Sequence, residues 1–272
     1  MNQFFSFQRF SLLVLKHWAD NKKRYLLSVI AFIGLLIAWF IFAMLVDSTI
    51  PLSKELQMIT YFFALFVVGS FYANQYFRDL GSRAKGINFL LVPASAFEKI
   101  LCSLLYTVIL FFIVFTAAFY VVDMLMVVLS NRFFNTDIAN REVGLLNVFE
   151  AARLPIEGEA GVNILLIFFA IQSAFLLGSV YFQKYSFIKT IISGFVIFFI
   201  VFCFVFFIYD LMPEGEYTNG FFRSYHIQTT GKDDYLVTIP SWPGQLLYYM
   251  VMYGVAPFLW IVTYFRLKEK QV

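Results

Sequence analysis

The side chains that most often carry catalysis or bind metals are few in this chain and lie far apart. It holds two histidines, His17 and His226, and two cysteines, Cys102 and Cys203. A histidine relay needs its members within hydrogen-bond reach, and a zinc site needs several N or S ligands close together. No HExxH, GxSxG or phosphate-loop motif is present in the sequence. We therefore expect an enzymatic site, a cofactor, a metal centre and a disulfide framework all to be absent.

The polar residues inside the apolar stretches are amides and hydroxyls. Ionisable residues at such positions would mark a proton or ion pathway, so their absence disfavours a secondary transporter. Amides and hydroxyls more often join neighbouring membrane helices by hydrogen bonds than line a substrate path. We predict this role, and leave the substrate path as the alternative, for Asn74, Gln75, Tyr106, Thr107, Thr116, Gln172 and Ser173.

Six uncharged apolar runs set the fold class. About 20 apolar residues suffice to cross a hydrocarbon core of roughly 30 Å as a helix. With 61% hydrophobic and 14% charged residues, the chain is far from the composition of a soluble domain. The runs are continuously apolar and lack the alternation of a transmembrane β-barrel. We predict one all-α polytopic membrane domain over residues 1–272, with spans at 25–46, 56–77, 100–122, 160–183, 190–209 and 244–265.

Basic residues are unevenly divided between the gaps that separate these runs. The N-terminus, the second and fourth gaps and the C-terminus hold 14 of the 20 Lys and Arg residues and only four acids. Under the positive-inside rule these gaps and both termini face the cytoplasm. Their formal charge of +10 suits anionic lipid headgroups. Because the cations are dispersed along membrane edges, nucleic acid is not expected as a partner.

The first 24 residues form an amphipathic pattern ahead of the first span. At 100° per residue, Phe4, Phe7, Phe10, Val14, Leu15 and Trp18 share one side of a helix. Such a helix lies in the membrane interface, although a soluble helix packed on a partner has the same pattern. The residues predicted at the membrane interface are Arg9, Lys16, Trp18, Lys22, Lys23 and Arg24.

The gap at residues 78–99 is the most patterned polar segment. Gly81 and Gly86 weaken any helix that continues from the second span, and Pro93 ends whatever precedes it. Ser95 and Glu98 have the spacing of a capping box, in which each side chain binds a free backbone N–H at a helix start. We therefore predict that the third helix begins near Ala96.

Two longer segments, residues 123–159 and 210–243, are predicted to lie outside. Within the first, Val143–Leu154 is expected to form a short surface helix. The second holds glycines and β-branched or aromatic stretches, which are typical of a hairpin or irregular structure. Neither segment is large enough to form an independent catalytic domain.

Residues 77–99 also carry a resemblance to a known family. The pattern Phe77-x-Asp79-Leu80, then Lys85, then Leu90-Leu91-Val92-Pro93-Ala94-Ser95-x-x-Glu98-Lys99 resembles the cytoplasmic loop of bacterial ABC-2 type permeases. The amphipathic N-terminal segment and the six spans are similar to that family too. The long segment at 123–159 departs from it.

The resemblance implies a membrane subunit that works with a separate ABC ATPase subunit and a second permease, identical or different, in the bacterial inner membrane. It implies an ATPase contact at or near Asp79, Leu80, Lys85 and Leu91 to Ser95 (Leu91, Val92, Pro93, Ala94, Ser95), with Glu98 and Lys99 orienting the third span.

Two functions from different classes follow from these patterns. The first is the permease of an ATP-driven exporter, whose substrate is amphipathic or lipid-like because the chain holds 37 Phe and few charges. The second is a non-transporting membrane scaffold or sensor whose outer segments bind a partner.

Overall fold

The computed structural model describes most of the chain. The described residues are 4–46, 52–133, 144–156, 159–182, 184–210, 224–227, 235–238 and 241–270. Six of the described helices are long and apolar enough to cross a membrane. The protein is therefore an all-α polytopic membrane protein, as predicted.

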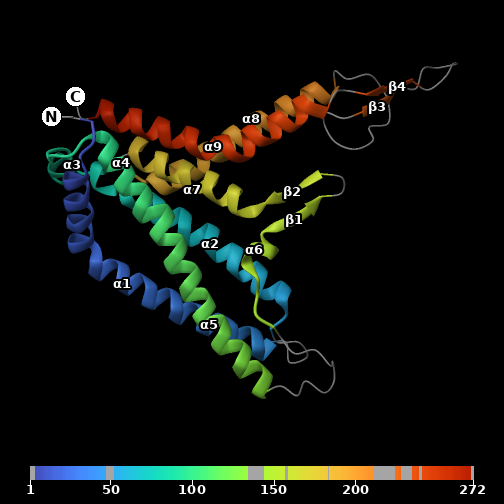
Figure 1. Cartoon of the computed structure of the whole chain (residues 1–272), viewed down its shortest axis with the longest axis horizontal. Helices are drawn as coiled ribbons and strands as arrows, with labels where there is room; N and C mark the ends of the chain where they lie inside the picture. The colour runs from blue at the N-terminus through green and yellow to red at the C-terminus, as the bar shows by residue number, and fades with distance from the viewer. Residues whose placement is uncertain are drawn as a thin grey trace.

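The helices have the following bounds: α1 Phe7–Val46, α2 Lys54–Tyr76, the 3₁₀ helix η1 Arg78–Gly81, α3 Arg83–Leu90, α4 Ala96–Leu104, the π-helix η2 Leu105–Leu110, α5 Phe111–Phe133, α6 Val148–Ala151, α7 Ile164–Tyr181, α8 Ser186–Asp210 and α9 Ser241–Glu269. The long helices converge at the end where both termini lie and spread toward the strands at the other end (Figure 1). Helix α7 is central, since it packs against α2, α8 and α9.

Besides the helices, the structure contains two short pairs of antiparallel strands. Strand β1 (Arg153–Ile156) pairs with β2 (Glu159–Asn163), and β3 (Ser224–Ile227) pairs with β4 (Tyr235–Thr238). Of the hairpin or irregular structure expected within residues 210–243, the structure shows the antiparallel pair of β3 and β4. The surface helix expected over Val143–Leu154 is wrong in extent, because among the described residues 144–154 only Val148–Ala151 is helical. Pro155 follows Leu154, and the residue before proline is disfavoured in a helix.

The first and third spans differ from the expected bounds. Helix α1 continues without a break through residues 21–24, so the predicted interfacial segment and the first span form one helix, which bends in Figure 1. The third span is the continuous helical stretch Ala96–Phe133, although a helix ending at residue 122 was expected. The first residues of the predicted outer segment at 123–159 are thus helical.

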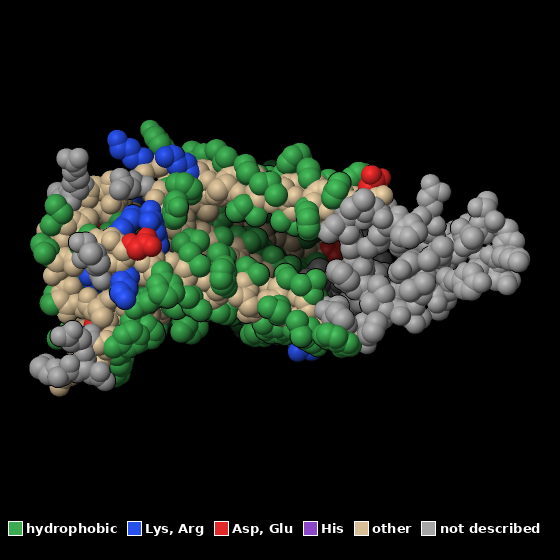
Figure 2. Space-filling model, turned by 90° about the horizontal axis from the view of Figure 1, so that it is seen from above, with side chains coloured by type: hydrophobic (Ala, Val, Ile, Leu, Met, Phe, Trp, Pro, Cys, Tyr) green, Lys and Arg blue, Asp and Glu red, His purple; other side chains and the backbone are tan. Residues whose placement is uncertain are grey.

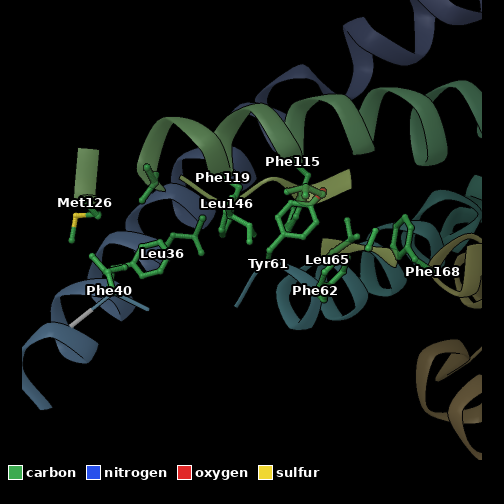
Figure 3. Packing of buried hydrophobic residues seen from close by; sticks show 14 of the residues in the cluster. Leu36, Phe40, Tyr61, Phe62, Leu65, Phe115, Phe119, Met126, Leu146 and Phe168 are labelled. Carbon is green, nitrogen blue, oxygen red and sulfur yellow. The ribbon is translucent and has the colours of Figure 1, made fainter. Parts of the chain in front are cut away.

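The larger core lies between α1, α2 and α5 (Figure 3). Tyr61 is fully buried, its ring lies edge-on to Phe119 with centroids 4.9 Å apart, and its hydroxyl hydrogen-bonds Thr116 at 2.9 Å. Aromatic pairs of this geometry add about 0.5–1.5 kcal/mol beyond their buried area. A second cluster around Phe77, Leu176 and Leu267 joins α2, α7 and α9 near the termini.

Most Lys and Arg side chains on the face seen in Figure 2 gather at the end that holds both termini. Hydrophobic side chains cover the length of the described bundle beyond them. A belt of apolar surface next to a basic end is the distribution that a membrane with anionic headgroups favours.

Candidate functional site

The capping box predicted at residues 95–98 is confirmed and begins α4 at Ala96. Glu98 N donates to Ser95 Oγ at 3.1 Å, and Ser95 N donates to Glu98 Oε2 at 2.9 Å. Two of the free N–H groups at the helix start are satisfied in this way. Pro93 lies in the turn between α3 and α4, so α3 ends before it, as predicted.

Glu98 also binds the beginning of the chain. Its Oε1 accepts from the backbone N of Ser6 at 2.7 Å and from Arg9 at 2.9 Å. Ser95 Oγ in turn donates to the carbonyl of Phe4 at 2.7 Å, and Phe4 stacks on Phe97. Arg9, predicted at the membrane interface, is thereby part of a latch that joins residues 4–9 to the start of α4.

Lys99 is buried and binds the end of α3. Its Nζ donates to the carbonyl of Leu90 at 3.1 Å and lies 5.3 Å from the centre of the Phe89 ring. A cation at the last carbonyls of a helix satisfies acceptors that the helix leaves free. Lys99 therefore fixes α3 against α4.

The remaining residues of the expected ATPase contact differ in exposure. Leu91 and Pro93 are exposed, Ala94 and Ser95 are half-buried, and Leu80 is half-buried against the second core cluster. Asp79 and Lys85 form an exposed ion pair at 3.8 Å. The residues accessible to a partner are therefore Asp79, Lys85, Leu91 and Pro93, whereas Glu98 and Lys99 act within the fold.

A cavity of about 820 Å³ lies between α1, α2, the 78–99 segment and the helices η2 and α5. Its polar lining comes from Lys16, His17, Asp20, Asn21, Arg24, Gln75, Asp79, Lys85, Asn88 and Lys99. Its apolar lining includes Ile30, Phe32, Val68, Phe71, Leu110, Phe111, Val114, Phe115 and Ala118. The volume falls in the range of about 300–1,000 Å³ that is usual for small-molecule sites.

Three residues predicted at the membrane interface, Lys16, Trp18 and Arg24, line this cavity. All five side chains are exposed, but Lys22 and Lys23 do not contribute to the lining. Sequence analysis assigned all of these residues to one interface because it could not show which face of α1 another helix covers.

An aromatic cluster forms one wall of the cavity. The His17 ring lies 4.7 Å from that of Tyr76 and 4.5 Å from that of Tyr106, and its Nε2 hydrogen-bonds Tyr25. Tyr72 continues the cluster, with its ring 5.5 Å from that of Tyr25. Sequence analysis missed this cluster, although tyrosines recur near the same end of the first three spans, as at a membrane interface.

The third span carries a π-helix at the cavity. Residues Leu105–Leu110 form η2, and Tyr106 and Leu110 of this segment line the cavity. Single π-turns within α-helices are frequent at functional sites because they re-aim side chains.

Several polar residues of the spans join helices, as predicted, whereas the hydroxyls of Thr107 and Ser173 bond within their own helix and Gln75 lines the cavity. Gln172 Nε2 of α7 donates to the carbonyl of Thr107, and Ser186 of α8 donates to Asn74 Oδ1 of α2 at 2.7 Å. Asn74 is buried by this contact. In hydrocarbon surroundings these bonds hold the helices in one register.

Asp123 corrects the expectation that the spans lack ionisable residues. It was placed at the start of an outer segment, but it lies within α5 and is fully buried. Neither of its carboxylate oxygens meets hydrogen-bond geometry with a described residue, although the backbone of Leu146 lies close enough to interact with the carboxylate. A buried carboxylate without a partner is costly.

Neither a protein-family model, nor a curated protein sequence, nor a solved structure matches this chain. The geometry of the cavity and of the 78–99 segment beside it is therefore the basis for assigning a function.

Proposed function

We propose that this chain is the membrane permease subunit of an ATP-driven exporter of the ABC-2 type. A separate ATPase subunit binds at the 78–99 segment, and two permeases, identical or different, pair with two ATPases in a bacterial inner membrane. ATP hydrolysis drives the export of an amphipathic or lipid-like substrate.

The observation that carries this proposal is that the 78–99 segment contributes directly to the cavity wall. Asp79, Asn88 and Val92 line the cavity, while Leu91 and Pro93 of the same segment are exposed. A protein that presses on the exposed side moves residues on the cavity side. This arrangement supports coupling between a motor and a substrate site.

The contacts of Glu98 and Lys99 favour transmission of that movement. Glu98 joins the start of α4 to Ser6 and Arg9 at the start of α1, and Lys99 joins α4 to the end of α3. Since α1 and the third span both line the cavity, a displacement of the segment reaches both elements.

The first test is purification of the tagged chain from its own membranes in mild detergent, with identification of partners and an ATPase assay. We expect a stoichiometric nucleotide-binding subunit. A clean preparation without ATPase activity would favour the scaffold, and attention would then move to the segments at 123–159 and 210–243.

Leu91→Lys sharpens this test, because Leu91 is 73% exposed and its replacement leaves the core intact. We expect this variant to lose most of the co-purifying ATPase at unchanged membrane level. Phe149→Lys is the matched control, since Phe149 is also exposed but lies in α6, away from the termini. Equal ATPase recovery with both variants would remove the 78–99 segment as the docking site.

A further inference from the structure

The lining of the cavity changes from charged to apolar in the same direction along three elements. On α1 it runs from Lys16 and Arg24 to Phe32. On α2, which runs the opposite way, Gln75 lies toward the charged end and Val68 toward the apolar end, and along the third span Lys99 precedes Val114. A wall that is polar at one end and apolar at the other fits an amphiphile, with its headgroup near the termini.

The charged end carries more cations than acids. Four cations, Lys16, Arg24, Lys85 and Lys99, line it together with two acids, Asp20 and Asp79, which leaves a formal charge of +2. Such an excess favours an anionic headgroup over a cationic one.

Two of the four cations already have partners in the fold. Lys85 pairs with Asp79, and Lys99 donates to the Leu90 carbonyl. Lys16 and Arg24 make no ion pair or hydrogen bond with any described residue. Lys16 lies close enough to Lys99 for their positive charges to repel each other. An anion bound between the two side chains reduces that repulsion.

The apolar end of the cavity suits the alkyl chain of an amphiphile. Phe32 of α1, Phe71 of α2 and Val114 of α5 line it from three different helices. The residues from Arg24, at the charged end, to Phe32 cover about 12 Å of helix at 1.5 Å per residue, which leaves room for an alkyl chain beyond the headgroup. The total of about 820 Å³ suits a small molecule rather than a polymer.

We propose that this cavity binds a single-chain amphiphile with an anionic phosphate or carboxylate headgroup, which Lys16 and Arg24 hold while the chain lies along Phe32 and Val114. The amphiphile enters from the membrane leaflet nearest the termini. Its role as exported cargo rests on the proposed function, whereas its binding needs no ATPase and is measured without one.

The test is isothermal titration of the purified full-length chain, in a neutral maltoside detergent, with dodecyl phosphate as the probe. Dodecylphosphocholine has the same chain with a zwitterionic headgroup, and inorganic phosphate has no chain. We expect dodecyl phosphate to bind at least about tenfold more tightly than either, since a hydrogen bond to a charged group contributes roughly 1.5–3 kcal/mol.

Two pairs of variants locate the site. Lys16→Gln with Arg24→Gln removes the headgroup partners, and the control Lys22→Gln with Lys23→Gln removes the same charge from exposed positions outside the cavity lining. We expect the first double variant to weaken binding of dodecyl phosphate about tenfold or more, and the control to leave it unchanged.

Val114→Trp fills the apolar end, and Ile113→Trp adds the same bulk at the neighbouring exposed position outside the lining. Only Val114→Trp is expected to reduce binding.

Equal effects within either pair of variants would overturn the proposal, because they would indicate non-specific electrostatic attraction of the probe or its non-specific hydrophobic partitioning. Inorganic phosphate that binds as tightly as dodecyl phosphate would also overturn it, in favour of a simple anion site. Loss of the ATPase partner with retained dodecyl phosphate binding would contradict the exporter but not the amphiphile site.

Discussion

At the scale of single residues, Glu98 joins distant parts of the chain through a buried carboxylate. Replacing it with Gln keeps the shape but removes the charge that Arg9 and the Ser6 amide bind. Because the carboxylate is fully buried and a charge-assisted bond is worth about 1.5–3 kcal/mol, we expect a loss of stability of that order. The measurement is the thermal midpoint in mild detergent.

The control for Glu98→Gln is Asp79→Asn. Asp79 pairs with Lys85 in an exposed position, and exposed pairs contribute about 0–1 kcal/mol. Its midpoint should stay near that of the unchanged protein. A Glu98→Gln midpoint no lower than that of Asp79→Asn would show that the latch contributes little to stability.

Asp123→Asn tests the buried carboxylate in α5. Since the oxygens of Asp123 meet hydrogen-bond geometry with no described residue, the neutral amide avoids the larger penalty of a buried charge. We expect the thermal midpoint to rise, by a stability gain on the order of 1–3 kcal/mol. The exposed Asp20→Asn should change little. A drop with Asp123→Asn would mean that the charge is stabilised in the folded protein.

Contacts between residues close in the sequence could be predicted, whereas contacts between residues far apart in the sequence could not. The pairing of Ser95 with Glu98 spans three residues, so the helix-start pattern alone predicts it. Arg9 lies 89 residues from Glu98, and no spacing rule connects them. The sequence therefore predicted where α4 begins, but not the contacts that join its first turn to residues 4–9.

At the scale of helices, α7 and α8 approach each other closely at Gly178. A Cβ added at Gly178 would lie 1.9 Å from Thr190 Oγ1 and 2.9 Å from Thr190 Cβ. We expect Gly178→Ala to force the helices apart and to cost about 1–3 kcal/mol, as overpacking does. Thermal unfolding in detergent, monitored by tryptophan fluorescence, measures the effect.

Two further variants distinguish crowding from a general effect of alanine. Gly194→Ala in α8 meets no atom within 4 Å, and should be neutral or stabilising because alanine favours helix. Adding Thr190→Ala to Gly178→Ala should recover part of the loss. The absence of any recovery would show that the contact with Thr190 is not the cause.

The number and order of the spans could be predicted because each run is long enough to cross the bilayer by itself. Their ends could not, since charge and polarity mark helix ends only indirectly. Asp123 was taken as the end of the third span, yet α5 runs to Phe133. The π-helix at Leu105–Leu110 has no composition that distinguishes it from the surrounding helix.

At the scale of the whole molecule, the cavity is the feature that sequence analysis could not reach. Its wall combines α1, α2, the 78–99 segment and the third span, so it exists only once these elements pack. What could be predicted is the direction of its polarity. The basic residues gather at the end with the termini (Figure 2), and the spans place the apolar residues beyond it.

The orientation of the protein in the membrane decides whether an ATPase in the cytoplasm can reach the 78–99 segment. With 14 of 20 basic residues in the termini and gaps predicted to be cytoplasmic, the positive-inside rule places the 78–99 segment inside. In a chain whose two cysteines are replaced by alanine, Lys85→Cys and Phe149→Cys report the two ends. We expect a membrane-impermeant thiol reagent to label Phe149→Cys on intact cells, and Lys85→Cys only after permeabilisation. The reverse pattern would put Leu91 and Pro93 beyond the reach of any ATPase in the cytoplasm, and would leave the scaffold as the function consistent with the charge distribution.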